Sequence, residues 1–297
     1  MRVLISGASG LIGSALRPAL VGAGHTTAAL VRRPPAGDQV QWEPGNALDP
    51  RRLEAFDAVV HLAGKSISGY WTEGFKREVR QSRVQGTQTL ATAVAESFQQ
   101  TGNPRAIVAA SAIGYYGNRG DELLTEASSR GMGFLADVCQ EWEDAAAPAV
   151  EAGVRVVHVR IGVVLAKHGG ALGAMLTPFR LGVGGRIGDG RQFMSWVMLD
   201  DVAGTFLFAL TQNELSGAVN AVAPQPARNA EFVQELGQAL HRPAVFPLPA
   251  IVVRTLFGEM GESLLLASTR VVPEKLEAAG YRFQYRELAA ALRAAVG

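Results

Sequence analysis

The chain has 297 residues, of which 48% are hydrophobic and 19% are charged, and this composition excludes an intrinsically disordered protein. Its 28 Lys and Arg residues nearly balance its 27 Asp and Glu residues, so the charge gives no indication of nucleic-acid or anionic-membrane binding. We therefore expect a small-molecule substrate and neither a nucleic acid nor a membrane as partner; the composition does not indicate the oligomeric state.

The numbers and spacing of the cysteine and histidine residues argue against disulfide bonds and metal sites. The single cysteine, Cys139, excludes a disulfide framework and a cysteine-rich zinc site, and it favours a reducing compartment. The five histidines lack the spacing of a metal site, so we expect no metal. The N-terminal apolar run is broken at Gly7 and does not resemble a signal peptide. These observations predict a cytoplasmic protein.

The first half of the chain alternates short β-branched segments with helical ones, which is typical of a parallel sheet covered on both faces. Strands are predicted at Arg2–Ser6, Thr26–Arg32, Ala58–Leu62, Arg105–Ser111 and Val154–Ile161, and a weaker one at Val40–Trp42 in the gap between the second and fourth strands. Helices are predicted at Leu11–Ala23, Glu73–Gln100 and Phe134–Glu151. The predicted fold class is therefore α/β, with a Rossmann-like, doubly wound parallel sheet.

Glycines become frequent after Leu165, and the stretch from Gly169 to Gly190 is predicted to be rich in loops. Beyond it the pattern predicts a helix at Asp201–Gln212, a strand at Gly217–Val222, a helix at Ala230–Leu240, an extended segment at Pro243–Pro249 and further short helices. We expect residues 1–168 to form a nucleotide-binding domain. Residues 169–297 are expected to form a smaller, mostly helical domain on the substrate side, with later strands of the sheet contributed from residues 190–225.

A glycine pattern follows the first predicted strand directly. Gly7, Gly10 and Gly13 form a G-x-x-G-x-x-G fingerprint that opens a helix, with Leu11 and Ile12 between the last two glycines. In such a turn the first glycine allows the tight bend, the second lets a pyrophosphate approach the backbone, and the third lets the helix pack closely on the strand. The free N–H groups of the helix start bind the phosphates. The pattern therefore predicts a dinucleotide site.

The end of the second predicted strand indicates which dinucleotide binds. An NAD-specific site usually has an acidic residue about twenty residues after the last glycine, where it binds the ribose 2′-hydroxyl. Arg32 and Arg33 stand there instead, and the nearest acid, Asp38, follows two prolines. Guanidinium groups suit a 2′-phosphate, so the sequence favours NADP(H), although two arginines can also simply end a strand in solvent.

These features, together with the segments 58–64 and 196–202, resemble the NAD(P)-dependent epimerase/dehydratase superfamily, the extended short-chain dehydrogenase/reductases. Further segments resemble an atypical epimerase-like subfamily that has its own C-terminal domain of unknown function and is sometimes labelled division-inhibitor-like. Those segments are Ser82-Arg83 and residues 111–117, 140–143, 160–165 and 220–285. The resemblance covers nearly the whole chain.

The resemblance implies a cofactor site at the carboxyl ends of the strands. Besides the glycine turn and the two arginines, it implies that Leu62, Ala63 and Gly64 line the cofactor and that Ser111 and Ala112 flank the nicotinamide. It also implies that Glu78 and Arg83 reach the cofactor or its phosphate, and that Arg160 and Ile161 border the nicotinamide.

The catalytic pair of typical family members is missing. They use Tyr-x-x-x-Lys, in which the tyrosine moves a proton and the lysine lowers the pKa of that tyrosine. None of the five tyrosines has a lysine four residues later, and the corresponding helix positions hold Phe134 and Val138. Tyr115 and Tyr116 follow the fifth strand and are the preferred proton donors, but two loop aromatics can equally be packing residues. Lys65 is the next candidate.

Two functions of different classes remain open. The first is an NADP(H)-dependent oxidoreductase or epimerase with an atypical active site, acting on a small polar substrate. This chemistry is feasible because the cofactor supplies the hydride step. The alternative is a sensor or regulatory protein that binds NADP(H) without turnover, which the loss of both catalytic positions favours. The sequence does not name the substrate.

Overall fold

A computed structural model describes all residues, 1–297, and its main element is a sheet of seven parallel strands. The spatial order is β11–β7–β5–β4–β1–β2–β3, so the sheet grows outward in both directions from its first strand. The strands are β1 (Arg2–Ser6), β2 (Thr26–Val31), β3 (Val40–Gln41), β4 (Ala58–His61), β5 (Ala106–Ala112), β7 (Arg155–Ile161) and β11 (Gly217–Ala221). The predicted Rossmann-like doubly wound sheet is confirmed.

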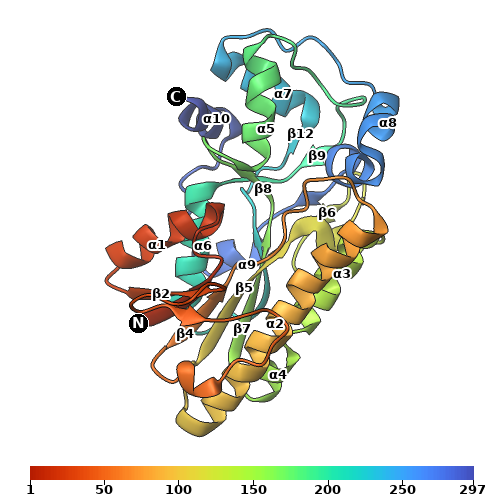
Figure 1. Cartoon of the computed structure of the whole chain (residues 1–297). Helices are drawn as coiled ribbons and strands as arrows, with labels where there is room; N and C mark the ends of the chain where they lie inside the picture. Colours follow the sequence, from red (N-terminus) through yellow and green to blue (C-terminus); the bar gives the residue numbers. More distant parts are fainter.

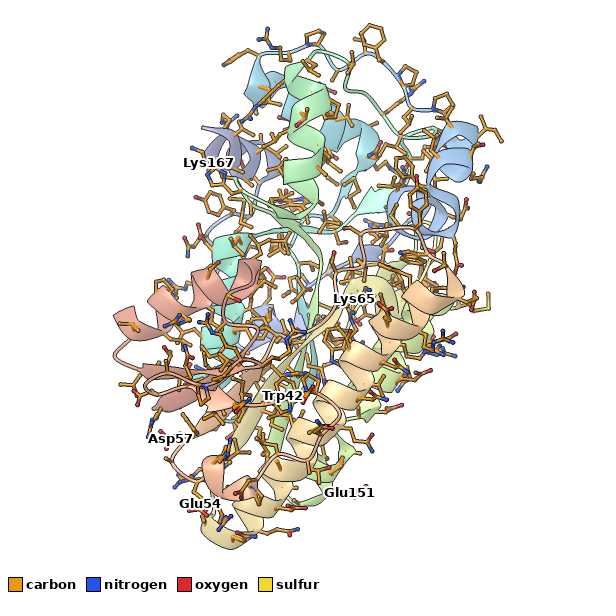
Figure 2. The ribbon with its side chains drawn as sticks, viewed as in Figure 1. Trp42, Glu54, Asp57, Lys65, Glu151 and Lys167 are labelled. Atoms are coloured by element: carbon orange, nitrogen blue, oxygen red, sulfur yellow. The ribbon has the colours of Figure 1, made fainter.

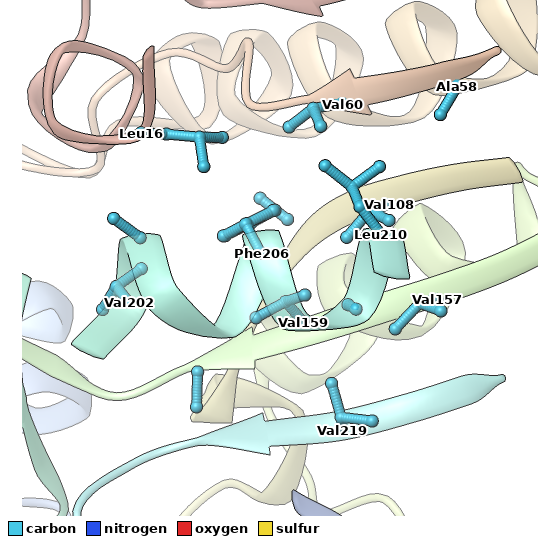
Figure 3. Packing of buried hydrophobic residues seen from close by; sticks show 14 of the residues in the cluster. Leu16, Ala58, Val60, Val108, Val157, Val159, Val202, Phe206, Leu210 and Val219 are labelled. Carbon is cyan, nitrogen blue, oxygen red and sulfur yellow. The ribbon is translucent and has the colours of Figure 1, made fainter. Parts of the chain in front are cut away.

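Helices cover both faces of this sheet (Figure 1). On one side lie α1 (Leu11–Gly22) and α6 (Leu199–Thr211), and on the other lie α2 (Glu73–Thr101), α3 (Phe134–Asp144) and α4 (Ala147–Glu151). Because side chains of a strand alternate between faces, Val3 and Ile5 pack toward α1 and α6, whereas Leu4 packs toward α2. Each face of the sheet thus has its own hydrophobic core. Figure 3 shows the core between the sheet and helices α1 and α6, with Leu16 and Phe206 packed against valines of the strands.

The later part of the chain packs beyond one end of the sheet (Figure 1). It contains α5 (Gly170–Arg180), α7 (Asn229–Leu240), α8 (Ala250–Gly261), a π-helical turn (Glu262–Leu266) and α10 (Leu288–Val296). Three small two-stranded sheets accompany them: β8 (Val163–Leu165) with β10 (Trp196–Met198), β9 (Phe193–Met194) with β12 (Ala227–Arg228), and β6 (Leu123–Leu124) with β13 (Arg270–Val271). The short α9 (Glu274–Ala278) instead packs against β11, where its Leu276 joins the core that contains Val3 and Ile5. No helix is both long and apolar enough to cross a membrane.

Two predicted elements differ from the structure. The single helix predicted over Phe134–Glu151 is two helices, because Pro148 has no N–H to continue the hydrogen bonds of α3 and lies instead in the first turn of α4. The stretch predicted as loop-rich contains α5, whose Leu172, Leu176 and Phe179 recur at helical spacing and are buried. Burial of this apolar face outweighs the high glycine content of the segment.

Candidate functional site

The glycine turn between β1 and α1 is closely packed. Gly7 has a φ of 68°, and a Cβ there would lie 2.8 Å from the carbonyl carbon of Leu62. A Cβ at Gly13 would lie 2.7 Å from the Cα of Ala8, which is too close for any side chain. Both positions therefore require glycine, one for its backbone conformation and one for the close contact of helix and strand.

The N-terminus of α1 has no side-chain cap. Gly10 is its N-cap and is exposed, and the first turn of the helix has no acidic residue. A Cβ at Gly10 would meet only the Gly7 carbonyl oxygen, at 3.3 Å. The N-terminal amides of α1 are thus available to an anion, and the backbone at Gly10 is free to be approached. The residues of this turn fit a dinucleotide pyrophosphate.

A buried hydrogen-bond network joins the turn to the end of β4. The Ser6 hydroxyl accepts hydrogen bonds from the backbone N–H groups of Leu62 (3.0 Å) and Ala63 (3.2 Å). Its own proton is therefore directed to Nδ1 of His61, 2.7 Å away, and His61 carries its proton on Nε2. Complete burial lowers the pKa of His61 to about 4, so the ring is neutral at neutral pH.

Arg32 and Arg33 lie immediately after β2, next to β1 in the sheet. Both are exposed and neither makes an ion pair or a side-chain hydrogen bond within the chain. The nearest acid in sequence, Asp38, instead lies 3.8 Å from the Arg2 guanidinium. The end of β2 therefore presents two free cations and no competing carboxylate.

The segment after β4 contacts α2. Leu62, Ala63 and Gly64 follow the strand directly, and the next residue, Lys65, pairs with Glu78 and lies with its Nζ 4.8 Å from the ring centre of Phe75. Arg83 donates to the backbone oxygen of Lys65 (2.9 Å), so its guanidinium holds this segment in place. Figure 2 shows Lys65 at the side of the sheet that faces the later part of the chain.

A second buried network lies at the carboxyl ends of β5 and β7. Glu143 of α3 accepts hydrogen bonds from Ser111 Oγ (2.7 Å) and, bidentately, from Arg160 (2.8 Å each). The Arg160 and Glu143 side chains are only 5% and 10% exposed. Burial alone would lower the pKa of Arg160, but its hydrogen bonds to Glu143 and the charge of that carboxylate raise the pKa instead. This ion pair stays charged and joins α3 to the carboxyl ends of β5 and β7.

The two candidate tyrosines differ in position. Tyr116 is fully buried; it donates to Asn220 Oδ1 (2.8 Å) and accepts from Arg160 (3.0 Å). Burial raises its pKa, and its hydroxyl is held by these two partners, whereas the predicted role as proton donor requires contact with a substrate. Tyr115 is partly exposed, and its ring centre lies 3.4 Å from the Arg160 guanidinium carbon. Tyr115 therefore remains the available phenol of the two.

The positions of the missing pair hold packing residues. Phe134 packs edge-on against Trp71 at 5.2 Å, and Val138 is buried. Cys139, on the same helix, is also buried, and burial raises its pKa to about 12, so its thiol stays protonated and is no nucleophile.

Sequence reasoning missed Glu143, Asn220 and the Ser6–His61 pair. A signal existed for Glu143: it lies four and seven residues after Cys139 and Ala136 on the buried side of α3, where an acid needs a cationic partner. Nothing local in the sequence marks Asn220, because its partner Tyr116 is 104 residues away. No group of three or more His, Cys, Asp or Glu side chains is placed to hold a metal ion.

Comparison with known proteins gives the family. The model of the NAD dependent epimerase/dehydratase family matches residues 3–222, and a domain of unknown function matches residues 248–295. An epimerase family protein of Mycobacterium tuberculosis is 44% identical over 98% of this chain and 96% of its own length. Epimerase family protein SDR39U1 of Homo sapiens is 41% identical over 99% of both chains.

Comparison with solved structures gives the same family. The crystal structure of human SDR39U1 (isoform 2) with NADPH has a TM-score of 0.89 and 38% identity, covering 100% of this chain and 99% of that one. A structure described as the nucleoside-diphosphate sugar epimerase of Corynebacterium glutamicum has a TM-score of 0.82 and 37% identity, covering 100% of this chain and 58% of that one. Both the family match and these relatives confirm the resemblance, and the chain belongs to the NAD dependent epimerase/dehydratase family.

Proposed function

We propose that this protein binds NADP(H) at the carboxyl edge of its seven-stranded sheet. One observation carries the choice of NADP(H) over NAD(H): Arg32 and Arg33 are exposed and unpaired after β2, while Asp38 is turned to Arg2. A 2′-phosphate would meet two free guanidinium groups there, whereas an unphosphorylated ribose would find no acid to bind it. The human relative solved with NADPH supports the same choice.

The residues that would hold the cofactor come from five strand ends, one of which is that of β2 with Arg32 and Arg33, and from α2. Gly7, Gly10, Leu11, Ile12 and Gly13 would bind the pyrophosphate, and Leu62, Ala63 and Gly64 would line the adjacent edge. Ser111, Ala112, Arg160 and Ile161 would surround the nicotinamide. Arg83 and Glu78 would act from α2, Arg83 by fixing the segment after β4 and Glu78 by pairing with Lys65.

For the reaction, we propose reversible oxidation and reduction of a small polar substrate, as in an oxidoreductase or epimerase. The nicotinamide supplies or accepts the hydride when it is bound. The chain must then exchange a proton with the substrate oxygen, and Tyr115 is the candidate because it is the partly exposed phenol that lies against Arg160. The buried Glu143–Arg160 pair would hold the ring of Tyr115 in place.

Residues 169–297 would form the substrate side of the site. The Corynebacterium relative is described as a nucleoside-diphosphate sugar epimerase, which makes nucleotide sugars the first substrates to test. The alternative is a protein that binds NADP(H) without turnover. The packing of Phe134 and Val138 at the usual catalytic positions, and the locked hydroxyl of Tyr116, favour that alternative.

A substrate panel separates the two. The purified protein, with NADPH, is offered aldehydes, ketones and nucleotide sugars while NADPH absorbance and product formation are followed, with Gly10→Val as the variant lacking the cofactor site. Slow turnover that the variant loses supports the enzyme. NADPH binding with no turnover across the panel supports the non-catalytic protein.

A further inference from the structure

A cavity lies in the later part of the chain, away from the main sheet. It has a volume of about 880 Å³ and is lined by residues of α7, by residues 241–247 and by Arg186. Figure 1 shows α7 at the end of the molecule opposite the main sheet. None of the residues proposed to bind the cofactor lines it.

The walls of this cavity are held by specific backbone contacts. Arg242 N–H donates to the Gly237 carbonyl (2.9 Å), and a Cβ on Gly237 would lie 2.9 Å from that of Ala244. Glycine at this position of α7 therefore lets the following segment cross the helix closely. On the other side, Phe246 N–H donates to the Gly184 carbonyl (3.2 Å) and ties that segment to the one that contains Arg186. These contacts fix the backbone around the cavity.

Its polar lining consists of groups able to donate hydrogen bonds. These are the side chains of Arg186, Gln234, Gln238, His241 and Arg242, and no carboxylate lines the cavity. Arg186 and Arg242 make no ion pair, whereas Arg228 and Arg254 in the same part of the chain bind Asp121 and Glu262. Two unpaired guanidinium groups beside amide donors form a surface complementary to an oxyanion.

The remaining lining is apolar. Val233, Ala244, Val245 and Pro247 contribute to it, and Val245 is 70% exposed. Exposed apolar surface beside unpaired cations suits a ligand that has both an anionic and an apolar part.

We propose that this cavity binds a small organic anion, in which a phosphate or carboxylate group is carried on an apolar body. The guanidinium groups of Arg186 and Arg242 bind the oxyanion, and the apolar wall around Val245 covers the body of the ligand. The volume lies within the roughly 300–1,000 Å³ typical of small-molecule sites. This site is separate from the proposed cofactor site and does not depend on it.

The test uses phenyl phosphate and benzoate as probes of the two oxyanions, and benzyl alcohol as a neutral probe of similar shape. Each is titrated into the ¹⁵N-labelled full-length protein, and backbone amide shifts are followed by NMR. We expect at least one anion to shift the amides of Gly237 and Arg242 saturably and to bind at least tenfold more tightly than benzyl alcohol. The double variant Arg186→Gln/Arg242→Gln is expected to weaken this binding at least tenfold. Arg17→Gln, at an exposed and unpaired arginine of α1, is expected to leave it unchanged.

Three results would overturn the proposal. The first is the absence of saturable shifts at α7 with both anions. The second is anion binding that the double variant retains while circular dichroism shows it folded; shifts at Gly10 would then place the phosphate at the glycine turn instead. The third is equal affinity for the neutral and the anionic probes.

Discussion

Acidification is expected to destabilise the protein, and the fully buried imidazole of His61 contributes to this loss. Complete burial lowers its pKa from 6.5 to about 4, so the folded state resists protonation that the unfolded chain accepts. The contribution of this group to stability is fully present above pH 6.5 and is lost as the pH falls from 6.5 toward 4. At about 1.4 kcal/mol for each unit of pKa, the loss amounts to about 3 kcal/mol.

Urea unfolding followed by circular dichroism at a series of pH values measures this loss. His61→Asn removes the titrating ring but keeps an amide oxygen that can accept the Ser6 proton. The stability advantage of the wild type over this variant is expected to shrink by about 3 kcal/mol between neutral pH and pH 4. His168→Asn, at a side chain that meets solvent in both states, is the control. Parallel curves for the wild type and His61→Asn would refute the reasoning.

Five further substitutions test the site. Gly10→Val is expected to abolish NADPH binding in calorimetry without changing the circular dichroism spectrum, since a Cβ there meets only one carbonyl oxygen. Gly13→Ala is expected to lower Tm as well, because its Cβ overlaps Ala8. Tight NADPH binding by Gly10→Val would show that the glycine turn is not the phosphate site. If the substrate panel reveals turnover, Tyr115→Phe is expected to lower kcat by ~10²-fold, as loss of a general acid does. Tyr116→Phe is expected to lower the free energy of unfolding in urea by about 1–3 kcal/mol, because it leaves the buried partners of the hydroxyl unpaired. An unchanged kcat in Tyr115→Phe would exclude Tyr115 as the proton donor. Glu143→Gln is expected to lower the free energy of unfolding by about 3–5 kcal/mol, because it leaves Arg160 buried without a counter-charge. A loss below about 1 kcal/mol would contradict the assignment of a buried ion pair shielded from water.

The strands of the main sheet could be predicted because each is a short, nearly continuous apolar run. Val3, Leu4 and Ile5, for example, are buried on both faces of the sheet, so their pattern differs from that of the helices. Long-range features could not be predicted in the same way. Pairing of β6 with β13 joins residues such as Leu123 and Arg270, and no local pattern specifies that contact.

The features of the candidate site likewise fall into local ones, which the sequence predicts, and long-range ones, which it does not. The glycine turn and the arginines after β2 follow from local backbone and charge requirements, so the sequence predicts them. The difference between Tyr115 and Tyr116 does not, because it depends on Asn220 and Arg160, which other strands bring to the phenol of Tyr116. Two adjacent tyrosines of equal chemistry thus have different surroundings that only the fold determines.

Calorimetric titration of NADPH and NADH into the same protein tests the central claim most directly. With Arg32 and Arg33 free at the end of β2, NADPH is expected to bind at least ~tenfold more tightly, which corresponds to about 1.4 kcal/mol. Arg32→Ala is expected to remove most of that difference, and Arg17→Ala none of it. Equal affinities, or a preference for NADH, would contradict the assignment of NADP(H) to this site.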